Sequence, residues 1–159
     1  MTLKEITLTE NNHFVGMEYY NLILNRTFLL IKIEGYLVGI LGNGVISVEG
    51  GKNILTREVT ALMAVKGDLE NPDSYLKNSY LEKVYDLNLL NGSIIKSNKT
   101  NFILKLSEIK TAKYNPKKKF GMGPYPHDGR VTIETKDNKK REFIILGNQS
   151  GEKIAKWIV

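Results

Sequence analysis

The 159-residue sequence contains no cysteine and only two histidines. The absence of cysteine excludes disulfides, thiol nucleophiles, iron–sulfur clusters and zinc sites built on thiolates. His13 and His127 lie far apart in the sequence without a His-x-x-x-His partner. No metal site is predicted, because a metal ion needs several convergent ligands.

Long apolar runs are also missing. The most apolar stretch, residues 28–41, is interrupted by Lys32 and Glu34 and is shorter than the roughly 20 residues that a transmembrane helix needs. The first ten residues have no apolar core followed by a small-residue cleavage site, so they do not indicate a signal peptide. We therefore expect a cytoplasmic protein, and its peripheral attachment to a membrane stays open.

Motifs of common enzyme classes are absent as well. The sequence has no Gly-x-Ser-x-Gly elbow, and Gly51-Lys52 lacks both the earlier glycine and the following Ser or Thr of a phosphate loop. Gly121-Met-Gly123 starts like a dinucleotide-binding fingerprint, but Pro126 occupies the place of its third glycine. We predict no catalytic residues, no cofactor and no enzymatic activity.

The composition that remains is that of an ordinary globular protein, with 42% hydrophobic and 25% charged residues. The length suits one domain, and neither an internal repeat nor a Gly/Ser/Pro linker divides the chain. Residues 1–159 are therefore expected to form a single α+β domain that is mostly β.

Short runs rich in β-branched and aromatic residues predict most of the strands. These runs cover residues 2–8, 19–24, 27–33, 36–41, 45–48, 56–65, 93–96 and 101–106, the last with an extension toward residue 114. Polar breaks at Asn25-Arg26 and Glu34-Gly35 favour an antiparallel meander. Residues 130–136 and 141–146 alternate and predict a hairpin that turns at Asp137-Asn138.

Two helices are expected from apolar spacing. The residues Leu76, Tyr80, Val84 and Leu87 recur at intervals of four, four and three. This single stripe predicts a central helix over about 72–87, with Pro72 in its first turn. At the C-terminus, Ile154, Trp157 and Ile158 follow the same spacing and predict a helix over about 149–158 that packs its tryptophan against the sheet.

The segment 102–109, the hairpin 129–145 and the terminal helix together resemble the closing half of a pleckstrin-homology-like domain of the bacterial or GRAM type. Residues 22–30 are similar to the strand-turn-strand opening of those families. The resemblance implies a bent antiparallel sheet or partly open small barrel, with a C-terminal helix that plugs one end. It also implies a protein- or lipid-binding scaffold, and it supplies no functional residues. The central helix would be an insertion.

The positive charge is concentrated in one segment. Residues 113–141 hold nine bases and three acids, which accounts for the whole net charge of +6. Such a concentration indicates a basic face, although a solvated surface explains it equally well. Our candidate binding residues all come from this segment: Lys117, Lys118, Lys119, Phe120, Arg130, Lys139, Lys140 and Arg141.

The preferred hypothesis is a non-catalytic binding domain that engages a protein or an anionic membrane surface through these residues. The alternative is a small nucleic-acid-binding protein, in which the same cations meet phosphates and Tyr114, Phe120 and Tyr125 stack on bases.

Overall fold

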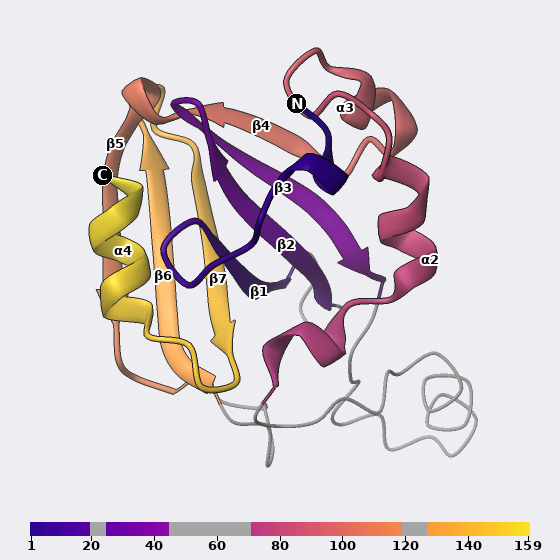
Figure 1. The fold of residues 1–159 in the computed structure, drawn as a ribbon. Coiled ribbons are helices and arrows are strands. Elements are labelled where there is room, and N and C mark those ends of the chain that lie inside the picture. Colours follow the sequence, from indigo (N-terminus) through magenta and orange to yellow (C-terminus); the bar gives the residue numbers. More distant parts are fainter. Residues whose placement is uncertain (20–24, 45–70, 119–126) are drawn as a thin grey trace, which may run out of the picture.

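The computed structural model describes residues 1–19, 25–44, 71–118 and 127–159. These residues form one antiparallel sheet of seven strands in the order β4-β3-β2-β1-β7-β6-β5. The sheet curls into a half-barrel with helices on both sides (Figure 1). The predicted fold class, α+β and mostly β with a bent antiparallel sheet, is confirmed.

The strands are β1 (His13–Tyr19), β2 (Asn25–Ile33), β3 (Tyr36–Asn43), β4 (Phe102–Lys105), β5 (Ile109–Asn115), β6 (His127–Thr135) and β7 (Lys140–Leu146). Glu34 and Gly35 join β2 to β3 with φ of 47° and 82°, as the tight turn of a two-residue hairpin requires. The predicted hairpin around Asp137-Asn138 is present as β6 and β7, and Asn138 has a φ of 62°.

The first and last strands meet in the middle of the sheet. Their pairing is short, with Gly16 opposite Ile145 and Met17 opposite Ile144. The side-chain amide of Gln149 continues this seam. Its oxygen accepts a hydrogen bond from the backbone N–H of Val15, and its nitrogen donates to the carbonyl of Val15, each at 2.8 Å. The amide thus replaces one more residue of strand pairing.

Each face of the sheet has its own core, because neighbouring residues of a strand point to opposite sides. On one face, residues such as Val15 and Leu29 pack with Tyr75, Val84 and other side chains of the segment 71–97. On the concave face, residues such as Phe28 and Phe143 pack with α4 (Gly151–Ile158). The curled sheet is therefore covered on both faces.

The predicted C-terminal helix is confirmed. Ser150 precedes α4, and its side chain accepts a hydrogen bond from the backbone N–H of Lys153, as expected of an N-cap residue. Trp157 meets Phe14 edge to face, with 5.8 Å between the ring centroids. The tryptophan packs against the concave face of the sheet, as its spacing predicts.

The prediction of one continuous central helix over 72–87 is wrong. The segment forms three short pieces, η2 (Pro72–Tyr75), α2 (Asn78–Leu81) and η3 (Glu82–Val84). Between the first two, Leu76 and Lys77 are extended, because the backbone N–H of Lys77 donates to the carbonyl of Gly42 at 2.8 Å. Pairing with β3 thus interrupts the helix.

Three further predictions fail. Residues 2–8 contain η1 (Leu3–Glu5), in which the Glu5 carboxylate accepts from the Thr2 N–H. Residues 93–96 belong to α3 (Ser93–Ser97), which starts after a left-handed Gly92 and buries only Ile94. The residues of the expected break at Asn25-Arg26 belong to β2.

The strand predicted over 101–106 is β4, and η4 (Leu106–Glu108) separates it from β5, the predicted extension. Of the strand expected over 19–24, Tyr19 is the last residue of β1 and residues 20–24 lie outside the described residues, as do the strands expected over 45–48 and 56–65. No helix in the described part of the chain is long and apolar enough to span a membrane.

Candidate binding site

The predicted basic residues do not form one face. Asn115, the last residue of β5, pairs with Arg130, whereas the β6–β7 turn lies at the other end of these strands. Lys117 and Lys118 follow β5 and are exposed at the end opposite that turn. The nine residues of β6 span roughly 30 Å at the usual rise of a strand. Lys119 and Phe120 lie outside the described residues.

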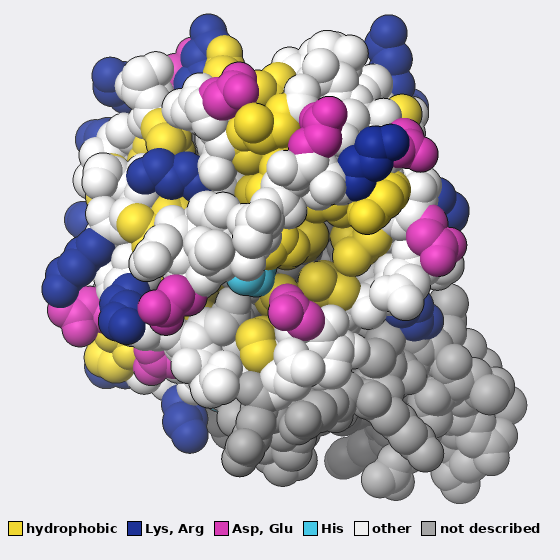
Figure 2. Space-filling model, in the orientation of Figure 1, with side chains coloured by type: hydrophobic (Ala, Val, Ile, Leu, Met, Phe, Trp, Pro, Cys, Tyr) yellow, Lys and Arg dark blue, Asp and Glu magenta, His cyan; other side chains and the backbone are white. Residues whose placement is uncertain are grey.

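Most of the described candidate cations have an acidic neighbour. Arg130 lies 3.3 Å from the carboxylate of Glu142, and Lys140 lies 3.3 Å from that of Glu134. Lys139 contacts Asp137 at 2.8 Å. Figure 2 likewise shows acidic side chains dispersed among the lysine and arginine side chains of the face in view. The candidate cations of the β6–β7 hairpin therefore lie among carboxylates.

The Asp137 carboxylate at the hairpin tip shows the effect of such pairing. The ammonium of Lys139 and the hydroxyl of Thr135, which donates at 2.5 Å, lower the pKa of Asp137 to about 2. Asp137 stays ionised at all ordinary pH values, and it holds Lys139 at the rim of the cavity described next.

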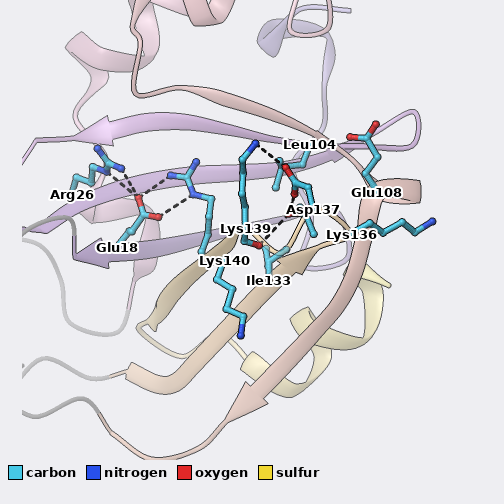
Figure 3. Close-up of a pocket in the computed structure, with 11 residues that line it drawn as sticks. Glu18, Arg26, Leu104, Glu108, Ile133, Lys136, Asp137, Lys139 and Lys140 are labelled. Atoms are coloured by element: carbon cyan, nitrogen blue, oxygen red, sulfur yellow. Dashed lines mark hydrogen bonds and ion pairs between the residues drawn. The ribbon is translucent and has the colours of Figure 1, made fainter.

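A cavity of about 790 Å³ opens on the concave side of the sheet, between the β4–η4 segment and the β6–β7 turn (Figure 3). Three acids line it, namely Glu18, Glu108 and Asp137. The cations that line it number five: Arg26, Lys136, Lys139, Lys140 and Arg141. The cavity therefore carries an excess of positive charge.

At the base of this cavity one carboxylate is shared by two guanidinium groups. Arg26 donates through Nε and Nη2 to Oε2 of Glu18, at 3.0 and 2.8 Å (Figure 3). Arg141 donates through Nε to Oε1 at 3.0 Å and through Nη2 to Oε2 at 2.8 Å. The Glu18 side chain is 11% exposed. Three neighbouring strands, β2, β1 and β7, supply this cluster.

Aromatic rings support the second guanidinium. The Cζ atom of Arg141 lies 3.6 Å from the ring centroid of Phe102, which is a close cation–π contact. The rings of Phe28 and Phe143 lie within 5.5 Å of the same atom. The Phe102 ring rests on Gly39, where a Cβ atom would approach it to 2.0 Å. The glycine therefore makes room for this aromatic floor.

A guanidinium has five N–H groups, and Arg141 directs only two of them at Glu18. Its Nη1 atom makes no hydrogen bond to the described residues, although the side chain is 21% exposed and lines the cavity. Hydrogen-bond donors of a fixed guanidinium are thus available to a ligand.

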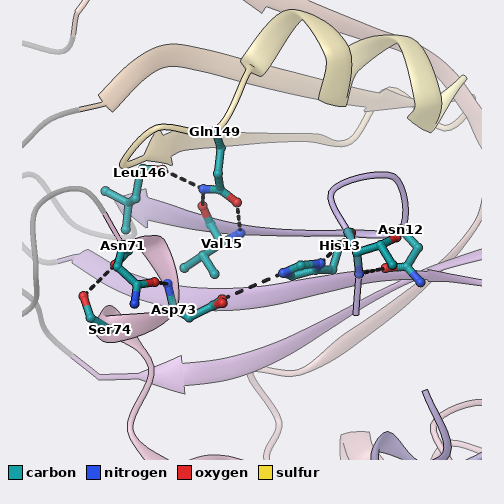
Figure 4. Close-up of polar contacts among 9 residues, drawn as sticks. Asn12, His13, Val15, Asn71, Asp73, Ser74, Leu146 and Gln149 are labelled. Atoms are coloured by element: carbon teal, nitrogen blue, oxygen red, sulfur yellow. Dashed lines mark hydrogen bonds and ion pairs between the residues drawn. The ribbon is translucent and has the colours of Figure 1, made fainter. Parts of the chain in front are cut away.

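A second cavity of about 320 Å³ lies between β1, η2 and the start of α4. His13 Nδ1 lies 2.6 Å from the carbonyl of Thr9, and its Nε2 lies 3.8 Å from the carboxylate of Asp73 (Figure 4). The nearby carboxylate of Asp73 raises the pKa of His13; burial opposes this rise, and the Thr9 carbonyl adds to it. No group of three metal-ligating side chains exists among the described residues.

Of the residues that line the large cavity, the sequence prediction names Lys139, Lys140 and Arg141 and misses the others, including Lys136 and the pair Glu18 and Arg26. The sequence analysis places residue 18 in no strand and residue 26 in a break between strands, although Phe14, Gly16 and Glu18 alternate as one face of a strand would. An acid at the end of such an alternation is the signal that could have indicated an inward carboxylate.

Comparisons with protein-family models, with curated proteins and with solved structures found no match for the chain.

Proposed function

We propose that this chain is a non-catalytic binding domain of pleckstrin-homology-like type, and that it holds an acidic segment of a partner protein at the 790 Å³ cavity. The bent antiparallel sheet and the packing of α4 against its concave face support the resemblance. Both features are what such a domain implies.

The observation that carries the proposal is the charge of the cavity. Five cations and three acids line it together with the apolar side chains of Leu104 and Ile133, and one of the cations, Lys140, pairs with Glu134 outside the lining. Lys136 makes no ion pair with the described residues and leaves its charge for a ligand. A concave, partly apolar site with a few convergent charges is the usual form of a binding pocket.

An anionic membrane is a weaker candidate on this geometry. A flat surface attracts lysines that share one side of a protein. Lys117 and Lys118 lie at one end of β6, and Lys139 lies at the other, next to Asp137. The two groups of lysines therefore cannot contact the same flat membrane surface together.

Nucleic acid also has less support. The hydroxyl of Tyr114 donates to Asp128 at 2.8 Å, and its ring lies against Gly151. This aromatic side chain is thus engaged within the fold rather than presented for stacking on a base. Phe120 and Tyr125 lie outside the described residues.

The test is fluorescence anisotropy with a labelled hexaglutamate peptide, and hexaglutamine serves as the uncharged control. Lys136→Glu/Lys139→Glu changes the charge of the cavity, whereas Lys117→Glu/Lys118→Glu makes the same change at the opposite end. We expect the cavity variant to weaken hexaglutamate binding about tenfold and the other to leave it nearly unchanged. Equal losses in the two variants, or no binding at low salt, would contradict the proposal.

Co-sedimentation with vesicles addresses the alternative directly. Pelleting with phosphatidylserine vesicles but not with neutral ones, together with no binding of hexaglutamate, would replace the protein partner with a membrane surface.

A further inference from the structure

One part of the 790 Å³ cavity, around Arg141, is suited to a more specific ligand than an acidic segment in general. We infer that Arg141 binds the carboxylate of a ligand that carries an apolar group next to that carboxylate. This inference rests on the proposed function and specifies which part of an acidic segment enters the cavity.

The argument starts from the edges of the guanidinium. Glu18 occupies the edge formed by Nε and Nη2, where it accepts one hydrogen bond from each. The edge formed by Nη1 and Nη2 keeps two roughly parallel N–H groups, a fork whose spacing matches the two oxygens of a carboxylate. Arg141 is thus able to bind a second carboxylate without losing the first.

The orientation of this fork is fixed before any ligand arrives. Contact with the Phe102 ring at 3.6 Å restricts the plane of the Arg141 guanidinium, and the two bonds to Glu18 restrict its rotation within that plane. Arginine normally loses much side-chain entropy on binding, and a guanidinium that is already held loses less. Glu18 and Phe102 act as positioning residues for the fork.

The surrounding charges favour a carboxylate over a dianionic group. Glu18 already neutralises part of the Arg26 and Arg141 charge, and Asp137 occupies Lys139. The corner formed by Glu18, Arg26 and Arg141 therefore keeps one excess positive charge, so a single negative charge suits it better than two.

The apolar part of the ligand has its own contacts. Leu104 and Ile133 line the cavity beside the arginine. A leucine-like group next to the carboxylate would cover these side chains and exclude water from the ion pair, which strengthens the pair.

The test compares N-acetyl-leucine with N-acetyl-leucinamide, which differ only in the carboxylate. Binding is followed by NMR on the full chain, with the side-chain N–H signals of its arginines as reporters. We expect the acid to move the Arg141 signals and the amide to bind at least about tenfold more weakly, because the amide cannot accept both hydrogen bonds of the fork. Equal binding of acid and amide, or no binding of either, overturns the inference.

Two variants locate the binding. Arg141→Lys keeps the charge but removes the fork, so the affinity for N-acetyl-leucine should fall about tenfold. Arg130→Lys, on a guanidinium paired with Glu142 elsewhere on β6, should leave that affinity unchanged. Equal losses in the two variants would overturn the inference. If Arg141→Lys fails to fold, the comparison of acid and amide on the wild-type chain still decides.

The two proposals fail separately. Hexaglutamate binding without N-acetyl-leucine binding ends the inference on Arg141 and leaves the binding domain in place. N-acetyl-leucine binding that depends on Arg141, without hexaglutamate binding, supports the corner and ends the proposal of an acidic protein segment. If neither hexaglutamate nor N-acetyl-leucine binds, both proposals are wrong.

Discussion

The guanidinium carbon of Arg141 lies 3.6 Å from the centre of the Phe102 ring, and Phe102 in turn rests on Gly39 of the neighbouring strand. These contacts form a column from the backbone of β3 through an aromatic ring to a charged group in the cavity. The position of the arginine therefore depends on the absence of a side chain at residue 39.

Gly39→Ala should displace the Phe102 ring, because the new Cβ atom would lie 2.0 Å from it. We expect a loss of about 1–3 kcal/mol in the free energy of unfolding, as for other overpacked cores. Urea denaturation measures this loss. In a Phe102→Leu background, the same glycine substitution should cost clearly less. If Gly39→Ala lowers the free energy of unfolding equally with Phe102 and with Leu at position 102, the new methyl group does not clash with the Phe102 ring.

Glu18→Gln should destabilise the fold by about 3 kcal/mol, because it leaves two largely buried guanidinium groups beside each other without their shared carboxylate. The matched control is Glu134→Gln, which removes a carboxylate held by Lys110 and Lys140, lysines that are more than half exposed. Since exposed pairs contribute little, its melting temperature should stay close to that of the wild type. Similar melting temperatures for the two variants would contradict a structural role for the shared carboxylate.

Gln149→Ala removes the amide that pairs with both backbone groups of Val15, a fully buried residue. Two unsatisfied buried groups should cost about 2–4 kcal/mol, and amide hydrogen exchange at Val15 should become faster. Ser150→Ala, which removes only the adjacent helix cap, should cost about 1 kcal/mol and leave exchange at Val15 slow. Unchanged exchange at Val15 in the glutamine variant would refute this role.

The contact between His13 and Asp73 should make stability depend on pH. The pKa of His13 is raised above its ordinary value of 6.5, chiefly by the carboxylate of Asp73. A raised pKa in the folded state means that this contact stabilises fully below about pH 6.5 and loses its effect as the pH rises through the folded-state value. Glu10 and Lys153, which also line this second cavity, lie 3.9 Å apart and largely offset each other.

Asp73→Asn is the variant that measures this dependence. Its melting temperature should fall further below that of the wild type at pH 5.5 than at pH 8, because only the protonated imidazole is stabilised by the carboxylate. Thermal unfolding over this range provides the measurement. A difference that does not change with pH would rule out His13 as the titrating group.

Patterns within a short stretch of sequence predicted correctly those elements that depend on few distant contacts. The β6–β7 hairpin and α4 follow from alternation, turn residues and helical spacing. The central segment shows the opposite case, since its apolar stripe fits a helix and yet the bond from Lys77 to Gly42 breaks it. A contact between residues so distant in sequence leaves no trace in the spacing of either segment.

The cavity could not be predicted from patterns within single segments of the sequence. The sequence predicts Arg141 as part of a basic surface, but its guanidinium is largely buried against Glu18 in the cavity, whereas the ammonium of its neighbour Lys140 is exposed and pairs with Glu134. Which face each residue takes depends on strand register, and a shift of one residue would exchange the two. The partnership of Glu18 with Arg26 and Arg141 depends on three strands, so it follows only from the sheet order.

The order of the seven strands has a consequence for how the chain is assembled. Apart from the pair β1–β7, each strand pairs only with its neighbours in the sequence, and η4 links the two edge strands β4 and β5. A cleavage within Leu106–Glu108 would leave every strand pair inside its own fragment except the seam between β1 and β7. The two fragments should therefore complement each other when mixed, and their dissociation constant would report the strength of that seam together with the helix contacts that cross it.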